Sequence, residues 1–283
     1  FWDPIQNLAG FYNKLITNLS AAERIFEILD TPAEVADNPG VTELPPIKGE
    51  VTFDHVSFAY SDDPDTLVLK DVSFTAAPGE TIALVGPTGA GKTTIVNLIS
   101  RFYNITSGTV RVDGHSLTDV SINSLRAQMG VMTQDNFLFS GTIRDNIAYG
   151  KLDATEEEIQ QALSIAQASD FVNSKPEGLN TMVSQGGANL SGGQRQRLTI
   201  ARALVGDPEI LIMDDSASAL DFATDAALRH AIHEQTKGMT VFIVSQRATS
   251  IKQADKILVL DDGELVGVGT HKELMESCEV YRE

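Results

Sequence analysis

Several features are scarce in this sequence, and each scarcity excludes a class of protein. Cys278 is the single cysteine among 283 residues, which excludes an intramolecular disulfide framework and a metal site built from cysteines. Apolar runs such as Val241–Val244 are far shorter than the roughly 20 residues of a membrane-spanning helix. The 21 basic residues against 39 acidic ones give a formal net charge of −18. That balance argues against a nucleic-acid partner held by broad phosphate neutralisation, so we expect none.

The first 31 residues carry a helical pattern. Asp3 suits an N-cap with Pro4 at the first helical position, and Asp30-Thr31-Pro32 is a stop signal. Apolar or small residues recur at alternating gaps of three and four, the spacing of a helix packed on another helix, at Ile5, Leu8, Tyr12, Leu15, Leu19, Ala22, Phe26 and Leu29. Either this stripe packs on its own domain, or it continues a helix bundle outside this sequence. Because the chain begins with Phe1 rather than Met, we expect a fragment of a longer protein.

The rest of the chain divides into a linker and an α/β region. Residues 32–49 form a proline-containing linker, and residues 50–283 form the main domain. Short β-rich runs, separated in the later part by helical stretches, predict a mostly parallel sheet with an antiparallel start, at 50–58, 67–75, 81–85, 109–112, 129–133, 209–213, 240–244 and 256–260. From about 141 to 205 the pattern is mostly helical, which predicts a helical insertion. Within it, Thr155 and Glu158 have the spacing of a capping box.

A glycine-rich segment lies between the strand expected at 81–85 and a helical stretch. It matches the pattern G-x-x-x-x-G-K-[ST] in full, with Gly86, Pro87, Thr88, Gly89, Ala90, Gly91, Lys92 and Thr93. Its glycines allow backbone N–H groups to turn inward around anionic oxygens, and the helix N-terminus adds partial positive charge. Lys92 would reach the β- and γ-phosphates, and the Thr93 hydroxyl would ligate Mg²⁺. The flanking elements disfavour a chance match, so the segment predicts binding of a nucleoside triphosphate.

A second candidate site residue ends a later strand. The apolar run Ile210-Leu211-Ile212-Met213 leads into Asp214. In open parallel sheets, ligands bind beyond the carboxyl ends of the strands, so an acid at that position is well placed for a cation. Asp214 would therefore hold Mg²⁺, directly or through water. Such a run alone is weak evidence, and its strength comes from the phosphate loop.

The segment Leu190-Ser191-Gly192-Gly193-Gln194 distinguishes among families that share this loop. With it, the chain resembles the nucleotide-binding domain of ATP-binding cassette (ABC) transporters over about residues 50–275. The resemblance implies an α/β fold, namely a P-loop NTPase core with a mostly parallel sheet, an antiparallel β subdomain and a helical insertion subdomain. It also implies that two domains pair head to tail, with ATP between one chain's phosphate loop and the other's Ser191–Gln194. Ser191 suits a helix N-cap, and the two glycines permit close backbone approach.

Other residues match motifs of the same family. Tyr60 matches the aromatic residue that stacks on adenine, and Gln134 matches the glutamine that contacts Mg²⁺ and faces the membrane domain. Ser218-Ala219-Leu220-Asp221 matches a loop that crosses the dimer interface. The ordinary alternatives are a core tyrosine, a surface glutamine and a simple turn. The resemblance implies Mg²⁺ ligands at Thr93, Gln134 and Asp214, and ATP contacts at Tyr60, Gly86, Pro87, Thr88, Gly89, Ala90, Gly91, Lys92, Thr93, Thr94, Ser191, Gly192, Gly193, Gln194 and Asp221.

The stretch Phe137–Ile147 and the opening helix are similar to those of exporters in which membrane and nucleotide domains share one polypeptide. On this resemblance, residues 1–31 are the end of the last membrane helix and a linker helix. The implied protein lies in the cell membrane with this domain on the cytoplasmic face. Its partners would be a second half-transporter subunit with transmembrane domains and a transported small molecule, lipid or peptide.

The sequence departs from the family pattern at residues that serve hydrolysis. Asp215 stands where the family usually has the Glu that polarises the attacking water, and its side chain is one methylene shorter. Gln246 stands in place of the usual switch histidine, and an amide has no titratable proton near neutral pH. A softer departure is Gln185, where exporters usually carry Glu. General-base catalysis depends on reach, so the first two changes are expected to weaken cleavage while binding by Lys92 is retained.

This pattern resembles one subunit of a heterodimeric exporter. Its own site would bind ATP and hydrolyse it poorly, with Asp215, Gln246, Lys92 and Gln134 as the residues nearest the chemistry, while Ser191–Gln194 completes the partner's site. One alternative is a self-sufficient homodimer with slow hydrolysis. A distant alternative is a soluble ABC ATPase of DNA repair or translation, which would need the basic surfaces that this acidic sequence disfavours.

Overall fold

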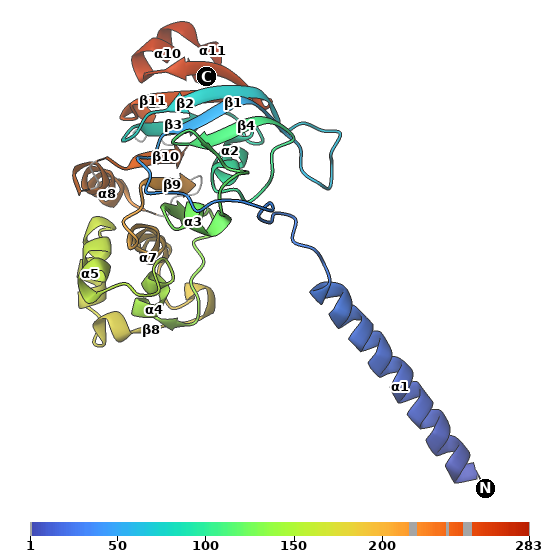
Figure 1. The fold of residues 1–283 in the computed structure, drawn as a ribbon. Coiled ribbons are helices and arrows are strands. Elements are labelled where there is room, and N and C mark those ends of the chain that lie inside the picture. The colour runs from blue at the N-terminus through green and yellow to red at the C-terminus, as the bar shows by residue number, and fades with distance from the viewer. Residues whose placement is uncertain (1, 215–219, 236–237, 246–250, 283) are drawn as a thin grey trace. The chain divides into compact units, whose positions relative to one another are not determined.

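The computed structural model describes residues 2–214, 220–235, 238–245 and 251–282 (Figure 1). The chain forms two compact units, Phe1–Ala36 and Asp37–Glu283, each of which is considered by itself. The first unit is built on α1 (Trp2–Leu29), in the segment where the spacing of apolar residues predicts a helix. Just after the end of α1, the Thr31 hydroxyl donates to the Glu27 carbonyl at 2.7 Å. None of the described helices is both long and apolar enough to cross a membrane.

Two sheets form the body of the second unit. An antiparallel sheet has the order β2-β1-β4-β5 and comprises β1 (Val51–Phe58), β2 (Leu69–Ala76), β4 (Ser107–Val112) and β5 (His115–Ser116). The main sheet has the order β12-β11-β3-β10-β9-β6, and only β12 runs antiparallel to its neighbour. Its strands are β3 (Thr81–Val85), β6 (Met129–Met132), β9 (Ile210–Asp214), β10 (Thr240–Val244), β11 (Lys256–Asp261) and β12 (Glu264–Gly269).

This architecture confirms the predicted α/β fold class, and a strand lies at or within two residues of each of the eight β-rich runs. Four strands were not expected. Three of them are two residues long, namely β5, β7 (Gly141–Thr142) and β8 (Met182–Val183). The fourth is the edge strand β12, which contains two glycines and alternates between exposed and half-buried residues, so its apolar pattern is weak.

The main sheet separates two large hydrophobic cores, and a third, smaller core lies around Ile257 and Leu274. All five residues of β9 are buried, and its side chains alternate between the two faces. Ile210 and Ile212 pack with the core of the antiparallel sheet and α2 (Lys92–Ile99), whereas Leu211 and Met213 pack with the helical core. A strand buried on both faces requires an unbroken apolar run, which explains the sequence of this segment.

The second core belongs to helices on one side of the main sheet, where Figure 1 shows α4, α5 and α7 grouped together. These helices lie between β6 and β9 in sequence and comprise α4 (Ile143–Ala148), α5 (Glu156–Ile165), α6 (Ser169–Asn173), the 3₁₀ turns η1 (Gly178–Asn180) and η2 (Gln185–Gly187), and α7 (Gly192–Leu204). The expected capping box of α5 is confirmed, since Thr155 and Glu158 bond reciprocally. The remaining helices among the described residues are α3 (Ile122–Arg126), α8 (Phe222–Gln235), α10 (His271–Ser277) and α11 (Glu279–Arg282).

A side-chain amide fastens the start of the second unit to the sheet. The Gln128 Oε1 accepts from the Ile47 N–H at 2.9 Å, and its Nε2 donates to the Pro45 carbonyl at 3.1 Å. The Gln128 main-chain carbonyl also accepts from the Glu209 N–H at 3.0 Å, just before β9. Gln128 therefore joins the segment before β1 to the strand that ends at Asp214.

Replacing Gln128 with Leu tests this connection. The substitution keeps the side-chain volume but leaves the amide of the buried Ile47 without its acceptor, so we expect a loss of about 1–3 kcal/mol in the free energy of unfolding. Urea denaturation measures it. The matched control is Gln160→Leu, because that amide makes one 3.4 Å bond to Glu156 on the same helix and the change should stay within about 0.5 kcal/mol. Equal stabilities for the two variants would contradict the role of Gln128.

Candidate functional site

The phosphate loop connects β3 to α2, and its glycines adopt backbone angles that other residues rarely reach. Gly86, Gly89 and Gly91 have φ of +143°, +86° and +97°. A Cβ on Gly86 would lie 2.0 Å from the Leu260 carbonyl oxygen. At Gly89 a Cβ would meet no heavy atom of the described residues within 4 Å, so the backbone is open there. The loop therefore combines tight packing on the protein with an accessible main chain.

Lys92 is the first residue of α2 and turns back into the loop. Its ammonium donates to the carbonyl oxygens of Gly86 and Pro87 at 2.8 and 2.7 Å. The residue is only 8% exposed, and this burial lowers the pKa of the ammonium, with the negative charge of Asp214 opposing the shift. A buried cation at a helix N-terminus gives the loop a strong preference for an anion.

The hydroxyl of Thr93 donates to Asp214 Oδ2 at 2.9 Å, so the structure brings these two predicted site residues together. Asp214 is the last residue of β9 and is 5% exposed. Strand β10 lies between β3 and β9 and is parallel to both, which puts the start of the loop and Asp214 at the same edge of the sheet. This is the edge at which ligands of parallel sheets bind.

The oxygen atoms of Thr93 and Asp214 are suitable ligands for a magnesium ion. Mg²⁺ prefers oxygen ligands and is usually held by one or two carboxylates together with substrate phosphates and water. Within the part of the chain that the structure describes, no cluster of three or more His, Cys, Asp or Glu side chains could hold a metal. A cation at this edge would thus depend on the Thr93 hydroxyl, the Asp214 carboxylate and the oxygens of a bound phosphate.

Gln134 lies two residues beyond β6 and is exposed. Strand β6 is parallel to β9, with Met132 opposite Met213, so Gln134 follows the strand end next to that of Asp214. Its main-chain carbonyl accepts from Asn136 Nδ2 at 3.4 Å. The amide side chain is therefore placed beyond the same sheet edge as the predicted Mg²⁺ ligands.

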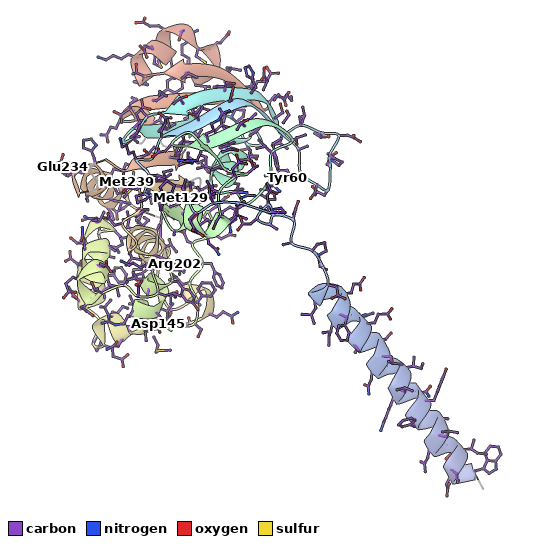
Figure 2. All side chains as sticks on the ribbon, viewed as in Figure 1. Tyr60, Met129, Asp145, Arg202, Glu234 and Met239 are labelled. Atoms are coloured by element: carbon purple, nitrogen blue, oxygen red, sulfur yellow. The ribbon has the colours of Figure 1, made fainter. Side chains whose placement is uncertain are left out.

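Tyr60 is half-buried and lies beside α2 (Figure 2). Its hydroxyl is 3.2 Å from the Thr94 hydroxyl, and its ring packs edge-to-face on Phe58 with centroids 4.8 Å apart. Thr94 directly follows Thr93 in the first turn of α2. The helix turn that ends the phosphate loop therefore also contacts Tyr60.

The segment Ser191–Gln194 begins α7, on the helical side of the sheet. Ser191 Oγ accepts from the Gln194 N–H at 3.2 Å, and Gln194 Oε1 accepts from the Ser191 N–H at 3.1 Å, a reciprocal capping box. The next two N–H groups, of Gly192 and Gly193, fall in the first turn, where N–H groups have no acceptor within the helix. Since α7 packs on α4, α5 and β6, this helix end is a separate element from the loop between β3 and α2.

Asp221 caps α8. Its carboxylate accepts from the Thr224 N–H at 2.9 Å and from the Thr224 hydroxyl at 2.8 Å, and these bonds hold the pKa of the carboxyl below its usual range. Within one chain, Asp221 therefore has a structural role as the N-cap of α8. The remaining site residues of the sequence analysis, Asp215 and Gln246, lie outside the described residues, as do Ser218 and Ala219.

An aromatic surface in the helical part was not singled out from the sequence. Phe137, Phe139 and Tyr149 are 43–55% exposed, and their rings pack in series with centroid distances of 5.3 and 4.6 Å. The Arg202 guanidinium, labelled in Figure 2, lies 5.6 Å from the Phe139 ring centre. The sequence signal for this surface was the pair of phenylalanines two positions apart, Phe137 and Phe139. Tyr149 lies ten positions beyond Phe139, and only the fold brings it to them.

Comparisons with known proteins agree with this geometry. The sequence model of the ABC transporter family matches residues 69–218. The chain is 45% identical over 278 residues to a fatty acid ABC transporter ATP-binding/permease protein of Mycobacterium bovis, covering 98% of this chain and 43% of that protein. It is 41% identical to an ATP-dependent lipid A-core flippase of Syntrophus aciditrophicus, covering 97% and 45%.

A solved structure of a bacterial Atm1-family ABC exporter with ATP bound superposes with a TM-score of 0.89 at 38% identity, covering 96% of this chain and 47% of that one. The chain thus spans less than half the length of each of these relatives. The family model covers more than half of the sequence, and the matched range contains the phosphate loop, Ser191–Gln194 and Asp214. The chain belongs to the ABC transporter family, of which it is a nucleotide-binding domain.

Proposed function

We propose that this chain binds and hydrolyses ATP as the cytoplasmic motor domain of an ABC exporter in the cell membrane. The observation that carries the proposal is the meeting of Lys92, Thr93 and Asp214 at the carboxyl edge of the parallel sheet. A buried ammonium, a hydroxyl and a buried carboxylate within one site suit a triphosphate with its divalent cation.

Phosphoryl transfer depends mainly on positioning and charge stabilisation, and each of these residues supplies part of that. Lys92 and the loop N–H groups would hold the phosphates. The hydrogen bonds from the Lys92 ammonium to the Gly86 and Pro87 carbonyls position its positive charge. Thr93, Gln134 and Asp214 would hold Mg²⁺, which would supply positive charge to neutralise the bound phosphates. Asp215 follows Asp214 directly in sequence and would orient the attacking water.

The complete site is proposed to need two chains. The N-terminus of α7 presents N–H groups and a partial positive charge, which suit a γ-phosphate. In one chain this helix end belongs to the helical part, while the phosphate loop belongs to the other side of the sheet. Head-to-tail pairing would bring the Ser191 segment of one chain to the loop of another, and Asp221 would lie near that interface.

The chain's own site is proposed to be impaired, within a heterodimer. Asp215 is shorter than the usual Glu, and Gln246 lacks the proton chemistry of a histidine, so both departures affect cleavage rather than binding. The features offered to a partner, Ser191 with its capped helix, are intact. The second candidate is a homodimer with slow hydrolysis, favoured by the retained negative charge at residue 215.

The membrane partner is proposed to dock near the aromatic surface of Phe137, Phe139 and Tyr149. These exposed rings follow Gln134 in sequence, so a contact there would be connected to the site through one short segment. Helix α1 would continue the membrane domain into the linker. Because the relatives are named for fatty acids, lipid A-core and, in Bacillus subtilis, putative multidrug export, we propose an amphipathic small molecule or lipid as cargo.

Replacing Lys92 with Met tests the binding site. The variant removes the charge at nearly constant length, and we expect ATP affinity to fall about 10- to 100-fold, the loss of a charge-assisted hydrogen bond of roughly 1.5–3 kcal/mol. Calorimetric titration with Mg·ATP measures it. The matched control is Lys151→Met, whose ammonium pairs with Glu158 at 2.7 Å in the helical part and should leave affinity unchanged. Unchanged affinity in the Lys92 variant would refute the proposed site.

The double variant Asp215→Glu with Gln246→His tests the impairment. Restoring reach and a titratable group should raise turnover at this site on the order of 10- to 100-fold, since a misplacement of about 1 Å costs a comparable factor. The readout is single-site ATP turnover in the full-length protein copurified with its partner, with Asp153→Glu and Gln161→His as a matched surface control.

The same measurements distinguish the second candidate. No gain in the double variant would contradict the argument from reach. Robust turnover by the purified chain alone, abolished by Asp215→Ala, would establish the self-sufficient homodimer instead.

A further inference from the structure

Three aromatic rings meet where β1 ends. Phe58 is 2% exposed, and its ring lies 4.8 Å from that of Tyr60 and 5.7 Å from that of Tyr103. Tyr60 and Tyr103 are themselves in contact, with centroids 5.0 Å apart and planes at 88°. Edge-to-face contacts of this kind are favourable and directional, so each ring restricts the orientation of the others. Tyr60 thus contacts a core phenylalanine and a second tyrosine, which are also neighbours of each other.

The far end of the Tyr60 ring is held as well. Its hydroxyl meets the Thr94 hydroxyl at 3.2 Å. A tyrosine side chain has two main torsions, and contacts at both its ring and its hydroxyl fix them. The ring is therefore oriented before any ligand arrives.

The first turn of α2 makes three contacts that together span the candidate site. Lys92 bonds the loop carbonyls, Thr93 bonds Asp214, and Thr94 contacts Tyr60. A helix turn is rigid, so the position of the tyrosine is set relative to the phosphate end of the site. Tyr103, which follows α2 by four residues, contacts the Tyr60 ring next to Phe58.

We propose that Tyr103 is a positioning residue, which holds the Tyr60 ring in the orientation that receives the base of the nucleotide. The inference rests on the proposed function, in which Tyr60 stacks on adenine. Tyr103 would not touch the nucleotide, and its effect would pass through Tyr60. Ordering a rotamer-rich side chain upon binding lowers affinity by roughly two- to tenfold, and pre-orientation avoids that loss.

The experiment compares ATP with inorganic tripolyphosphate, which has the phosphates but no base. Affinities of the 283-residue chain for both are measured by calorimetry for Tyr103→Leu. Tyr103→Phe keeps the ring and serves as the rescuing variant. Phe102→Leu is the matched control, because that neighbouring aromatic side chain is exposed and lies against Arg126. Tyr60→Leu sets the full size of the base contribution.

We expect Tyr103→Leu to weaken ATP binding about three- to tenfold while tripolyphosphate binding stays unchanged, with wild-type values in Tyr103→Phe and Phe102→Leu. Wild-type ATP affinity in Tyr103→Leu, alongside weakened binding in Tyr60→Leu, would overturn the inference alone. Equal losses for both ligands would also overturn it, since they would indicate a damaged loop. If Tyr60→Leu binds ATP like the wild type, the base-binding role of Tyr60 fails and this inference fails with it.

Discussion

The hydrogen bond between Thr93 and Asp214 is the contact on which the site depends, because it joins the helix after one strand to the end of another. A cation at this edge would draw on oxygen atoms of both residues. Their approach requires β3 and β9 to lie parallel on either side of β10, with their carboxyl ends at one edge. That arrangement in turn requires strands that are apolar on both faces, and β9 and β10 are buried throughout.

The two cores give the site its rigidity and also its incompleteness. Side chains of β9 pack alternately into both cores, so Asp214 is fixed by the packing of the whole second unit. The phosphate loop and Tyr60 lie with one core, while Ser191 begins a helix of the other. The helix N-terminus of one chain carries partial positive charge that suits the phosphates of a nucleotide bound to the loop of another chain. The proposed function is therefore dimeric.

The sequence predicts the elements of the site well and their mutual contacts poorly. The loop could be found because its chemistry requires glycines and a lysine at fixed spacing, and Asp214 because it ends an apolar run. The capping box at Ser191 is also local, since it spans four residues. Contacts across the fold left no such signal: Tyr103 lies 43 positions beyond Tyr60, and the two rings meet only because β1 ends beside α2. Asp221, by contrast, was identified through a family motif, and in the structure its contact is local, with Thr224 three residues later.

The central claim is that the Ser191 end of α7 serves a phosphate bound to another chain. The most direct measurement is ATP turnover of the full-length protein, copurified with its partner, carrying Ser191→Asp or Ser191→Asn in this chain. Both replacements are good N-caps, so the helix is retained, but only Asp adds a negative charge beside the phosphate. We expect Ser191→Asp to lower turnover more than about tenfold relative to Ser191→Asn, a difference of about 1.4 kcal/mol in transition-state stabilisation. Equal turnover in the two variants would contradict it.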